Sequence, residues 1–280
     1  DVARTAVSVM GLEDKETTDS SLEANMRKAL RIFAKTPTAL AAFYRIRKGK
    51  KIIKPKKNLN MAENFFYMCF GKVPQKEIVK AFDVSLILYA EHSFNVSTFT
   101  ARTITSSLSD IHGAITGAIA SLKGPLHGGA NEEVMHMMNK IKKPENALKW
   151  INNALKNKEV VMGFGHRVYK SGDSRVPTMR RYFSKVAKIK KDKKFEKIYD
   201  IVEKVMIEQK NIHPNVDYPT GPTYHLMGFD TDFFTPIFVI SRITGWSAHI
   251  MEQHAANKLI RPLASYKGNQ HRKVVQLNQR

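Results

Sequence analysis

The sequence predicts a protein that is mainly α-helical. Apolar residues recur at helical spacing in one segment after another, as at Ile78, Phe82, Leu86 and Tyr89. No series of short alternating segments indicates a β-sheet, and the sequence contains no internal repeat or low-complexity stretch. The 280 residues suffice for one large domain or two smaller ones around a buried core.

The first half of the chain is expected to form a series of helices. Leu22, Met26, Leu30 and Phe33 mark the first, and Thr36-Pro37 is expected to end it and to start a second, alanine-rich helix over residues 38–46. The same apolar spacing predicts helices over residues 61–70 and 76–89, and residues 97–107 are helix-like but rich in hydroxyl side chains.

Residues 110–122 combine a helical pattern with small side chains on one side. These are Gly113, Ala114, Gly117, Ala118 and Ser121. Small residues at this spacing allow two helices to approach closely. We therefore expect a helix that is buried or lies between subunits.

The second half of the chain is also expected to be helical, over residues 132–141, 144–157, 180–210 and 235–257. The charged segment 180–210 should break near residues 191–193, and residues 160–162 are the expected short strand. The tail, residues 258–266, is expected to be extended. Pro214 and Pro219 bracket Asp217, which predicts that this aspartate lies on a rigid, non-helical turn.

The formal charge of +21, from 46 Lys and Arg against 25 Asp and Glu, permits binding to nucleic acid, an anionic membrane or a polyanionic small molecule. Much of the charge lies in residues 45–57 and 185–197, which lack interleaved aromatic residues and any nucleic-acid fold signature. We therefore expect solvated lysine faces and no nucleic-acid partner.

Cys69 is the single cysteine, which excludes an internal disulfide framework and fits a reducing compartment. It lies in an apolar helical run, where we expect it to pack in the core. No segment is long and apolar enough to span a bilayer, and the first residues show no signal-peptide pattern. We expect a cytoplasmic protein without a membrane partner.

Two glycine-rich stretches each enclose one histidine. GPLHGGAN contains His127, and GFGHRVYKSGDSR contains His166 with Arg175 behind a polar turn. Glycine allows a backbone to approach a ligand closely, and arginine offers a planar fork for a carboxylate or phosphate. A glycine turn before an ordinary basic helix is the alternative interpretation.

These residues suit a reaction between a dianionic keto acid and an acidic carbon. An aspartate, Asp217, can serve as general base, one neutral histidine can donate to an enolate oxygen, and another can polarise the ketone. Arginines would hold the carboxylates, and Arg242, near an apolar helix face, needs an anionic partner. Structural alternatives remain open: His92 as a helix cap, Asp217 as a turn acid and Arg242 in an ion pair. The sequence contains neither an HExxH motif nor paired metal-ligand spacing, so it does not predict a metal site.

The sequence resembles the citrate synthase family. GPLHGGANE, GFGHRVYKSGDSR and PNVD are similar to three signature stretches of that family, in the same order. The likeness extends over essentially the whole chain. The segments LILYAEHSFNVSTFTAR and FTPIFVISRITGWSAHIMEQHAANKLIRP are most similar to the bacterial 2-methylcitrate synthase branch, which condenses propionyl-CoA with oxaloacetate.

The resemblance implies a role for each candidate residue. Asp217 would take the α-proton of an acyl-CoA, His127 would hydrogen-bond the thioester oxygen, and His166 would polarise the ketone of oxaloacetate. The other implied oxaloacetate ligands are His92, Arg175, Arg242 and, from the partner subunit, Arg261. The implied CoA-binding residues are Val160, Val161, Met162, Gly163, Phe164 and Gly165, with the side chain of Lys170. The thioester is a substrate, and no cofactor is implied.

The resemblance also implies an all-α homodimer with an active site between two domains. Residues 1–126 and 223–280 would form the large domain with its C-terminal arm, and residues 127–222 the small domain, which closes over the substrates. Family members usually carry a further part of the large domain ahead of the position matching Asp1, and proline where Ser174 stands. Citrate synthase, using acetyl-CoA, is the alternative activity. A non-catalytic basic regulator or nucleic-acid binder is a remote alternative.

Overall fold

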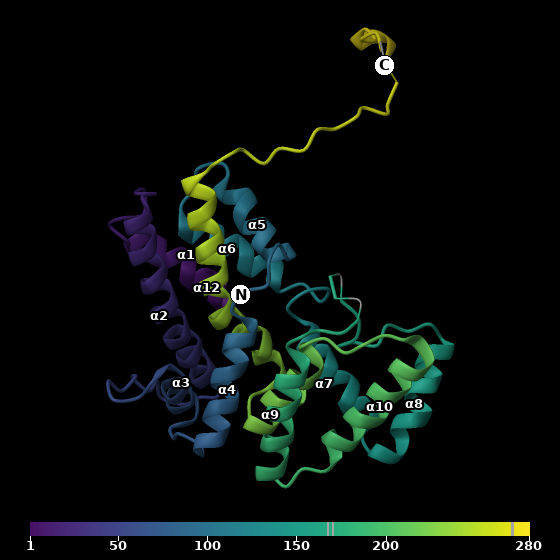
Figure 1. Cartoon of the computed structure of the whole chain (residues 1–280). Helices are drawn as coiled ribbons and strands as arrows, with labels where there is room; N and C mark the ends of the chain where they lie inside the picture. The colour runs from purple at the N-terminus through teal and green to yellow at the C-terminus, as the bar shows by residue number, and fades with distance from the viewer. Residues whose placement is uncertain (167, 170, 270–271) are drawn as a thin grey trace.

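A computed structural model describes residues 1–166, 168–169, 171–269 and 272–280. Within them the fold is α-helical, as the sequence predicts (Figure 1). The only β-type pairing among the described residues is an isolated bridge between Phe164 and Pro214, so the strand expected at residues 160–162 is wrong. The helices are α1 (Val2–Glu13), α2 (Leu22–Ile46), α3 (Met61–Phe70), α4 (Lys76–Tyr89), α5 (Val96–Thr105), α6 (Ile111–Leu122), α7 (Ala130–Ile141), α8 (Pro144–Lys156), α9 (Val176–Ile189), α10 (Lys194–Lys210), α11 (Asp217–Met227) and α12 (Phe234–Ala255), with 3-10 turns η1 (Thr231–Phe233) and η2 (Leu277–Gln279).

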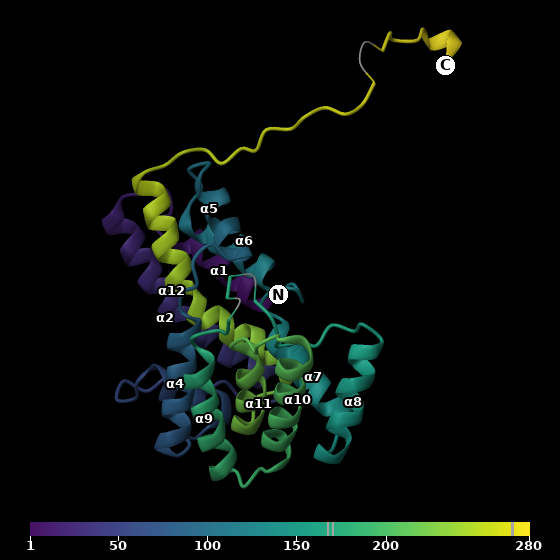
Figure 2. The ribbon, with the colours of Figure 1, turned by 45° about the vertical axis from the view of Figure 1, so that its right-hand side comes forward.

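The helices gather in two groups that meet along one line. Helices α1, α2, α5 and α6 pack around the long helix α12, while α7 to α11 pack on one another at the other end of the molecule (Figures 1 and 2). Contacts of α4 with α9 and of α12 with α7 join the groups. The site residues predicted from the sequence come from both groups, so the line where they meet is where a site can form.

Helices α3 and α4 have the bounds that the sequence predicts. Asn60 caps α3 by accepting the N–H of Glu63, whose side chain accepts the N–H of Asn60 in return, and Gly71 ends the helix with a φ of 80°. Cys69 is buried in α3, which confirms its expected place in the core. Phe65, Phe66 and Phe82 form an aromatic cluster with Phe229 that joins these helices to the segment between α11 and η1.

The predicted break at Pro37 is wrong, because α2 runs unbroken from Leu22 to Ile46 with Pro37 inside it. Proline lacks the N–H that would bond one turn back. In the same turn the hydroxyl of Thr36 donates to the carbonyl of Ile32, at 2.7 Å, and Pro37 is buried. The buried packing of this turn therefore overrides the local preference of proline to end a helix.

The prediction that Asp217 lies on a non-helical turn is also wrong, because Asp217 is the first residue of α11. Pro219 lies in the first turn, where a backbone N–H has no intrahelical partner in any case. Gly221 lies against the carbonyl of Asn131, since a Cβ there would stand only 2.8 Å from that oxygen. The glycine that weakens the helical pattern is thus required where α11 crosses α7.

The other helices expected from the sequence are present, with ends that differ by up to four residues, as at Val176, where α9 begins. The charged segment breaks between Ile189 and Lys194, and the small residues of α6 lie against α5, where a Cβ on Gly117 would stand 2.2 Å from Cδ1 of Ile104. Residues 258–266 are extended and leave the body of the molecule (Figure 1). Among the described helices, none is both long and apolar enough to cross a membrane.

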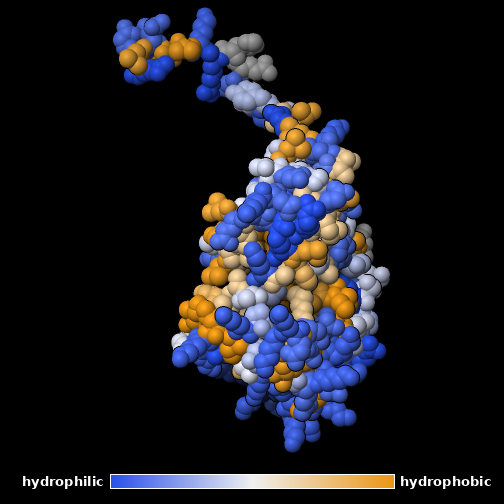
Figure 3. All heavy atoms as spheres, turned by 90° about the vertical axis from the view of Figure 1, so that its left-hand side faces the viewer, coloured by the Kyte–Doolittle hydropathy of each residue, from blue (hydrophilic) through white to orange (hydrophobic). Residues whose placement is uncertain are grey.

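The surface explains much of the positive charge. Viewed from the side of α2 and α3, hydrophilic side chains cover most of the molecule, with hydrophobic patches between them (Figure 3). The lysines at the end of α9 and in the turn before α10 are largely exposed, among them Lys185, Lys188, Lys190 and Lys191. This agrees with the solvated lysine faces that we expect from the sequence.

Candidate active site

A cavity of about 110 Å³ lies where the two groups of helices meet. It is lined by the three predicted catalytic residues and three of the predicted oxaloacetate ligands, together with residues that the sequence did not single out. A larger outer cavity of about 660 Å³ shares His92, His127, His166 and Asp217 and opens to the surface. The lining residues of the inner cavity are Tyr89, His92, Asn95, His127, His166, Arg175, Asn215, Val216, Asp217, Phe238 and Arg242.

Backbone hydrogen bonds join the loop of His166 to the loop before Asp217. The N–H of Gly165 donates to the carbonyl of His213, and the N–H of Asn215 donates to the carbonyl of Gly163, both at 2.9 Å. Gly163 has a φ of 84°, and a Cβ there would lie 2.7 Å from Val134 and 2.9 Å from Tyr218. Only glycine fits at this position, which is the reason for the first glycine of the GFGH stretch.

His127 is held by the loop between α6 and α7. Its N–H donates to the carbonyl of Gly124, and the next residue, Gly128, donates to the carbonyl of Leu122. Nε2 of His127 lies 2.8 Å from the hydroxyl of Ser97 and 3.4 Å from the N–H of Ser97. If Nε2 accepts that N–H, the ring proton is on Nδ1. Burial, followed by the charge of Arg242, lowers the pKa of His127 to about 4, so the ring is neutral at pH 7.

His166 is held in one tautomer by its own loop. Its Nδ1 accepts the N–H groups of Val168 and Tyr169, at 3.1 and 3.2 Å, so the ring proton lies on Nε2. Nε2 is 3.0 Å from Nε2 of His92. Burial, followed by the charge of Arg175, lowers the pKa of His92 to about 4, and burial also lowers the pKa of His166. Both rings are therefore neutral, and His166 is the donor of the pair.

Asp217 stands at the N-terminus of α11 with its side chain in the cavity. Its Oδ1 accepts a hydrogen bond from the hydroxyl of Tyr89. Burial raises the pKa of Asp217 to about 6, although the hydrogen bond from Tyr89 and the charge of Arg175 favour the ionised form. A carboxylate with a pKa near neutrality is well matched to removing a proton from carbon.

Arg175 is oriented by a buried carboxylate. Nε and one terminal nitrogen of Arg175 donate to the two oxygens of Asp173, at 2.9 and 2.7 Å. Asp173 is buried and also accepts the N–H groups of Arg175 and Val216. Burial opposes the ionisation of Asp173, but Arg175 outweighs this effect and lowers its pKa. The ion pair fixes Arg175 and ties it to the chain just before Asp217.

Arg242 is a buried cation on α12. Its Nε donates to the carbonyl of Tyr89 at 2.6 Å, its guanidinium lies 4.8 Å from the centre of the Phe238 ring, and no carboxylate pairs with it among the described ion pairs. One terminal nitrogen, Nη1, is buried without a hydrogen-bond partner in the described part of the chain. Burial, together with the charge of Arg175, lowers the pKa of Arg242 to about 10. An anion in the cavity would supply the missing partner.

Comparison with known proteins identifies the family. The family model described as citrate synthase, C-terminal domain, matches residues 1–263. The chain belongs to the citrate synthase family. A protein of Mycolicibacterium smegmatis named citrate synthase is 54% identical over 275 residues, which are 98% of this chain and 73% of the relative. A Mycobacterium tuberculosis protein named 2-methylcitrate synthase is 54% identical over 272 residues, 97% of this chain and 69% of the relative.

A solved structure of the family has the same fold. Citrate synthase from Thermoplasma acidophilum, described as a ternary complex with carboxymethyl coenzyme A and oxaloacetate, superposes with a TM-score of 0.91 at 34% identity. The match covers 99% of this chain and 75% of that one. The resemblance and the all-α fold expected from the sequence are thus confirmed.

The residues implied for CoA binding in this citrate synthase family member do not line the inner cavity. Val160, Val161 and Phe164 border a separate cavity of about 350 Å³ with Lys158 and Lys210, and Gly165 borders the outer cavity. Met162 is half-buried against the core and Gly163 is buried, while Lys170 lies outside the described residues. Arg261 lies on the exposed tail, away from the cavity lining of its own chain.

Sequence reasoning did not find several residues of the site. The apolar spacing marks Tyr89 as a core position of α4, Ser97 begins a hydroxyl-rich helical pattern, and no sequence signal singles out Phe238. Asn95 caps α5 by accepting the N–H of Thr98, and it also accepts from the hydroxyl of Ser97. The one available signal was proximity, since Tyr89, Asn95 and Ser97 flank His92 within a few residues.

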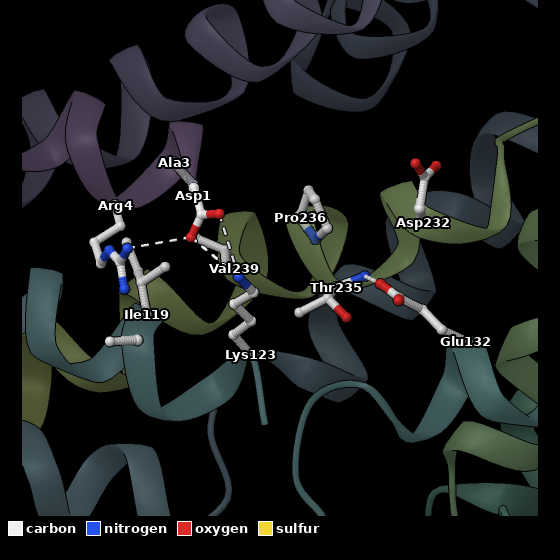
Figure 4. A pocket seen from close by; sticks show the side chains of 11 residues that line it. Asp1, Ala3, Arg4, Ile119, Lys123, Glu132, Asp232, Thr235, Pro236 and Val239 are labelled. Atoms are coloured by element: carbon white, nitrogen blue, oxygen red, sulfur yellow. Dashed lines mark hydrogen bonds and ion pairs between the residues drawn. The ribbon is translucent and has the colours of Figure 1, made fainter. Parts of the chain in front are cut away.

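A further cavity, of about 310 Å³, contains none of the predicted site residues (Figure 4). Asp1 from the start of α1 pairs there with Arg4 and Lys123, and Glu132 accepts the N–H of Thr235 at the start of α12. Its charged groups are thus largely paired with one another. Nor does any group of three His, Cys, Asp or Glu residues suited to a metal ion occur in the part of the chain that the structure describes.

Proposed function

We propose that this citrate synthase family member is an acyltransferase that condenses an acyl-CoA with oxaloacetate and water, releasing CoA. The observation that carries the proposal is the inner cavity, which is lined by a buried carboxylate of raised pKa, three neutral histidines and two arginines. Each group matches one requirement of the reaction, and CoA enters as a substrate without any further cofactor.

The first step is removal of the α-proton of the acyl-CoA. Asp217 takes the proton, the C–H electron pair forms the enolate, and the charge develops on the thioester oxygen. With Nε2 accepting the N–H of Ser97, His127 has its ring proton on Nδ1, from which it donates to that oxygen. A neutral donor suits this role, because its pKa of about 4 keeps the ring uncharged at pH 7.

The second step joins the enolate carbon to the ketone carbon of oxaloacetate. His166 donates from Nε2 to the ketone oxygen and protonates the alkoxide as the new bond forms, because its Nδ1 is occupied by two N–H donors. Arg175 and Arg242 hold the carboxylates of oxaloacetate, with His92 beside His166. Water then attacks the thioester carbon of the adduct and CoA leaves as the thiol.

Further parts of the proposal concern the assembly. We propose a homodimer in which Arg261 of one subunit completes the oxaloacetate site of the other, since the exposed tail carries this residue away from its own cavity. Residues 127–222 would form a small domain that closes on the large domain, residues 1–126 and 223–280. Residues 160–165 and Lys170 would bind CoA, supported by the cavity that Val160 and Val161 border beside Lys158 and Lys210.

The test is release of free thiol from acetyl-CoA and propionyl-CoA in the presence of oxaloacetate. We expect release with both the protein and oxaloacetate present, and its loss by at least about 1000-fold in Asp217→Ala with oxaloacetate binding retained. Asp83→Asn, which changes an exposed carboxylate on α4, is the matched control. Normal turnover in Asp217→Ala would overturn the assignment.

The acyl group is decided by one methylene, worth about 1–3 kcal/mol in an apolar pocket, or roughly 10- to 200-fold in kcat/KM. We propose propionyl-CoA as the preferred substrate, because the segments LILYAEHSFNVSTFTAR and FTPIFVISRITGWSAHIMEQHAANKLIRP resemble the 2-methylcitrate synthase branch, although relatives of both names are 54% identical to this chain. Comparing kcat/KM for the two thioesters tests this choice. A higher value for acetyl-CoA would make the protein a citrate synthase in activity.

A further inference from the structure

Tyr89 connects the proposed base to one of the arginines. It is the last residue of α4 and is buried, with its ring packed 4.3 Å, centre to centre, from Phe238. Its hydroxyl donates to Oδ1 of Asp217, and its carbonyl accepts Nε of Arg242. One residue therefore contacts Asp217 through its side chain and Arg242 through its backbone.

The two oxygens of Asp217 have different surroundings. Oδ1 is taken by Tyr89, whereas Oδ2 has no hydrogen bond within the described part of the chain. The carboxyl lines the inner cavity with His127 and His166. A general base needs a free lone pair, and Oδ2 has both of its lone pairs free of hydrogen bonds from the described residues, whereas Oδ1 shares one with Tyr89.

We propose that Tyr89 is a positioning residue for the base, holding Oδ1 of Asp217 so that Oδ2 removes the α-proton of the acyl-CoA. This inference rests on the function proposed above. In the step, the C–H bond breaks, its electron pair enters the enolate, and the proton passes to Oδ2. Asp217 is then a neutral acid, still held at Oδ1, until it releases the proton to solvent.

Tyr89 can keep this role over the working pH range because its own proton is firmly held. Burial and the charge of Asp217 raise the pKa of Tyr89 well above its ordinary value, so the phenol stays a donor. The other groups that act on the pKa of Asp217 are Arg175 and Asp173 before α9 and Arg242 on α12. His92, His127 and His166 share the cavity with it and are neutral at pH 7.

Replacing Tyr89 by phenylalanine keeps the packed ring and removes only the donor. A hydrogen bond to the ionised carboxylate lowers its pKa, so its loss raises the pKa of Asp217. We expect the acidic limb of kcat/KM against pH to move upward by about one pH unit in Tyr89→Phe. At pH 7 the smaller ionised fraction alone should lower kcat/KM about twofold, and the lost positioning should bring the total fall to about 10-fold. The isotope effect with α-deuterated acyl-CoA should rise as proton transfer becomes slower. Oxaloacetate binding should change little.

Tyr224→Phe is the matched control, because Tyr224 is also buried and its hydroxyl contacts Ser85, at 2.9 Å, instead of Asp217. In Tyr224→Phe the acidic limb of kcat/KM against pH should have the same midpoint as in the unmodified protein. An active, folded Tyr89→Phe protein with an unmoved acidic limb would overturn the inference. If Tyr89→Phe does not fold, 3-fluorotyrosine at position 89 replaces it: a stronger donor should move the limb to lower pH, and an unmoved limb overturns the inference. Absence of thiol release from the unmodified protein would instead overturn the proposed function.

Discussion

The Nε2 atoms of His92 and His166 lie 3.0 Å apart, so only one proton fits between the two rings. That proton belongs to His166, because its Nδ1 already accepts the N–H groups of Val168 and Tyr169. A ketone oxygen that enters the cavity takes the place of His92 as the acceptor. The donor is thus prepared before the substrate arrives, at no cost of reorientation.

The first prediction concerns this donor. His166→Gln removes the ring proton and should lower kcat by about 100- to 1000-fold, since the alkoxide loses its proton source. Thiol release at saturating oxaloacetate and acyl-CoA measures the effect. His136→Ala, on the exposed side of α7, is the control and should retain full activity. A loss of less than tenfold in His166→Gln would contradict the proposed role.

The second prediction concerns pH. Asp217 acts as a base only when ionised, and its pKa is about 6, so kcat/KM should rise with pH through about 6 and level off above 7. The pKa values of His92 and His127, about 4, lie below this range, so these rings should add no limb between pH 6 and 8. Initial rates from pH 4.5 to 8.5 give the profile. A profile that is already flat at pH 5 would contradict the raised pKa of Asp217.

The same shifts act on stability with opposite signs. The pKa values of His92 and His127 are lowered from 6.5, so their contribution to folding is lost as pH falls from 6.5 toward 4. The pKa of Asp217 is raised from 3.8, so its contribution is largest below 3.8 and is lost as pH rises through about 6. Unfolding should therefore be measured at the same pH values as the initial rates. A loss of activity without unfolding is then due to protonation of the base and not to loss of the fold.

The third prediction concerns the Asp173–Arg175 pair. Asp173→Asn removes a buried charge that two nitrogens of Arg175 contact, and should lower the free energy of unfolding by about 3 kcal/mol. Asp200→Asn is the matched control, because Asp200 pairs with Arg180 at the surface and should cost at most about 1 kcal/mol. Denaturant titration of both variants makes the comparison. Equal losses would mean that burial does not govern the strength of the Asp173 pair.

The fourth prediction concerns the loop of His127. A Cβ on Gly128 would lie 2.5 Å from the carbonyl oxygen of Leu122, which is backbone and cannot turn away. Gly128→Ala should therefore cost about 1–3 kcal/mol of stability and displace His127, with a loss of kcat. In Gly124→Ala the nearest atom is 3.5 Å away, and little change is expected. Thermal melting and thiol release check both variants, and similar behaviour would refute the steric argument.

Much of the fold could be predicted because single helices carry local signals. The capping pair Asn60 and Glu63 and the left-handed Gly71 define α3 almost completely. Pro37 wrongly predicts the end of a helix, because the free-energy cost of proline inside a helix can be inferred from the sequence, whereas the tertiary packing that offsets this cost cannot. The prolines and glycine of α11 misled in the same way, because Gly221 is explained only by the distant carbonyl of Asn131. Segment α1 carries so little periodicity that no helix was predicted there.

The site could be predicted from its motifs but not its contacts. His127, His166 and Asp217 stood out because glycines and prolines around them have no purpose in an ordinary helix. Tyr89 did not, because a tyrosine in an apolar helix face has the pattern of a core residue. Its hydroxyl reaches Asp217 across 128 positions of sequence. Local sequence patterns span only a few residues and therefore cannot predict a contact between residues so far apart in the chain. The placement of Arg261, Lys170 and the domain boundaries remains a prediction.

Two hydrogen bonds between the loop of His166 and the loop before Asp217 are made by main-chain atoms, from Gly165 to His213 and from Asn215 to Gly163. The side-chain amide of Asn215 adds a third, to the carbonyl of Gly165. Apart from Asn215, the spacing between His166 and Asp217 is therefore set by backbone contacts. Residues that face the acyl group can be exchanged during evolution without moving the acid and the base apart. The preferred thioester can therefore change by successive single substitutions during evolution, and the enzyme can stay active after each of them.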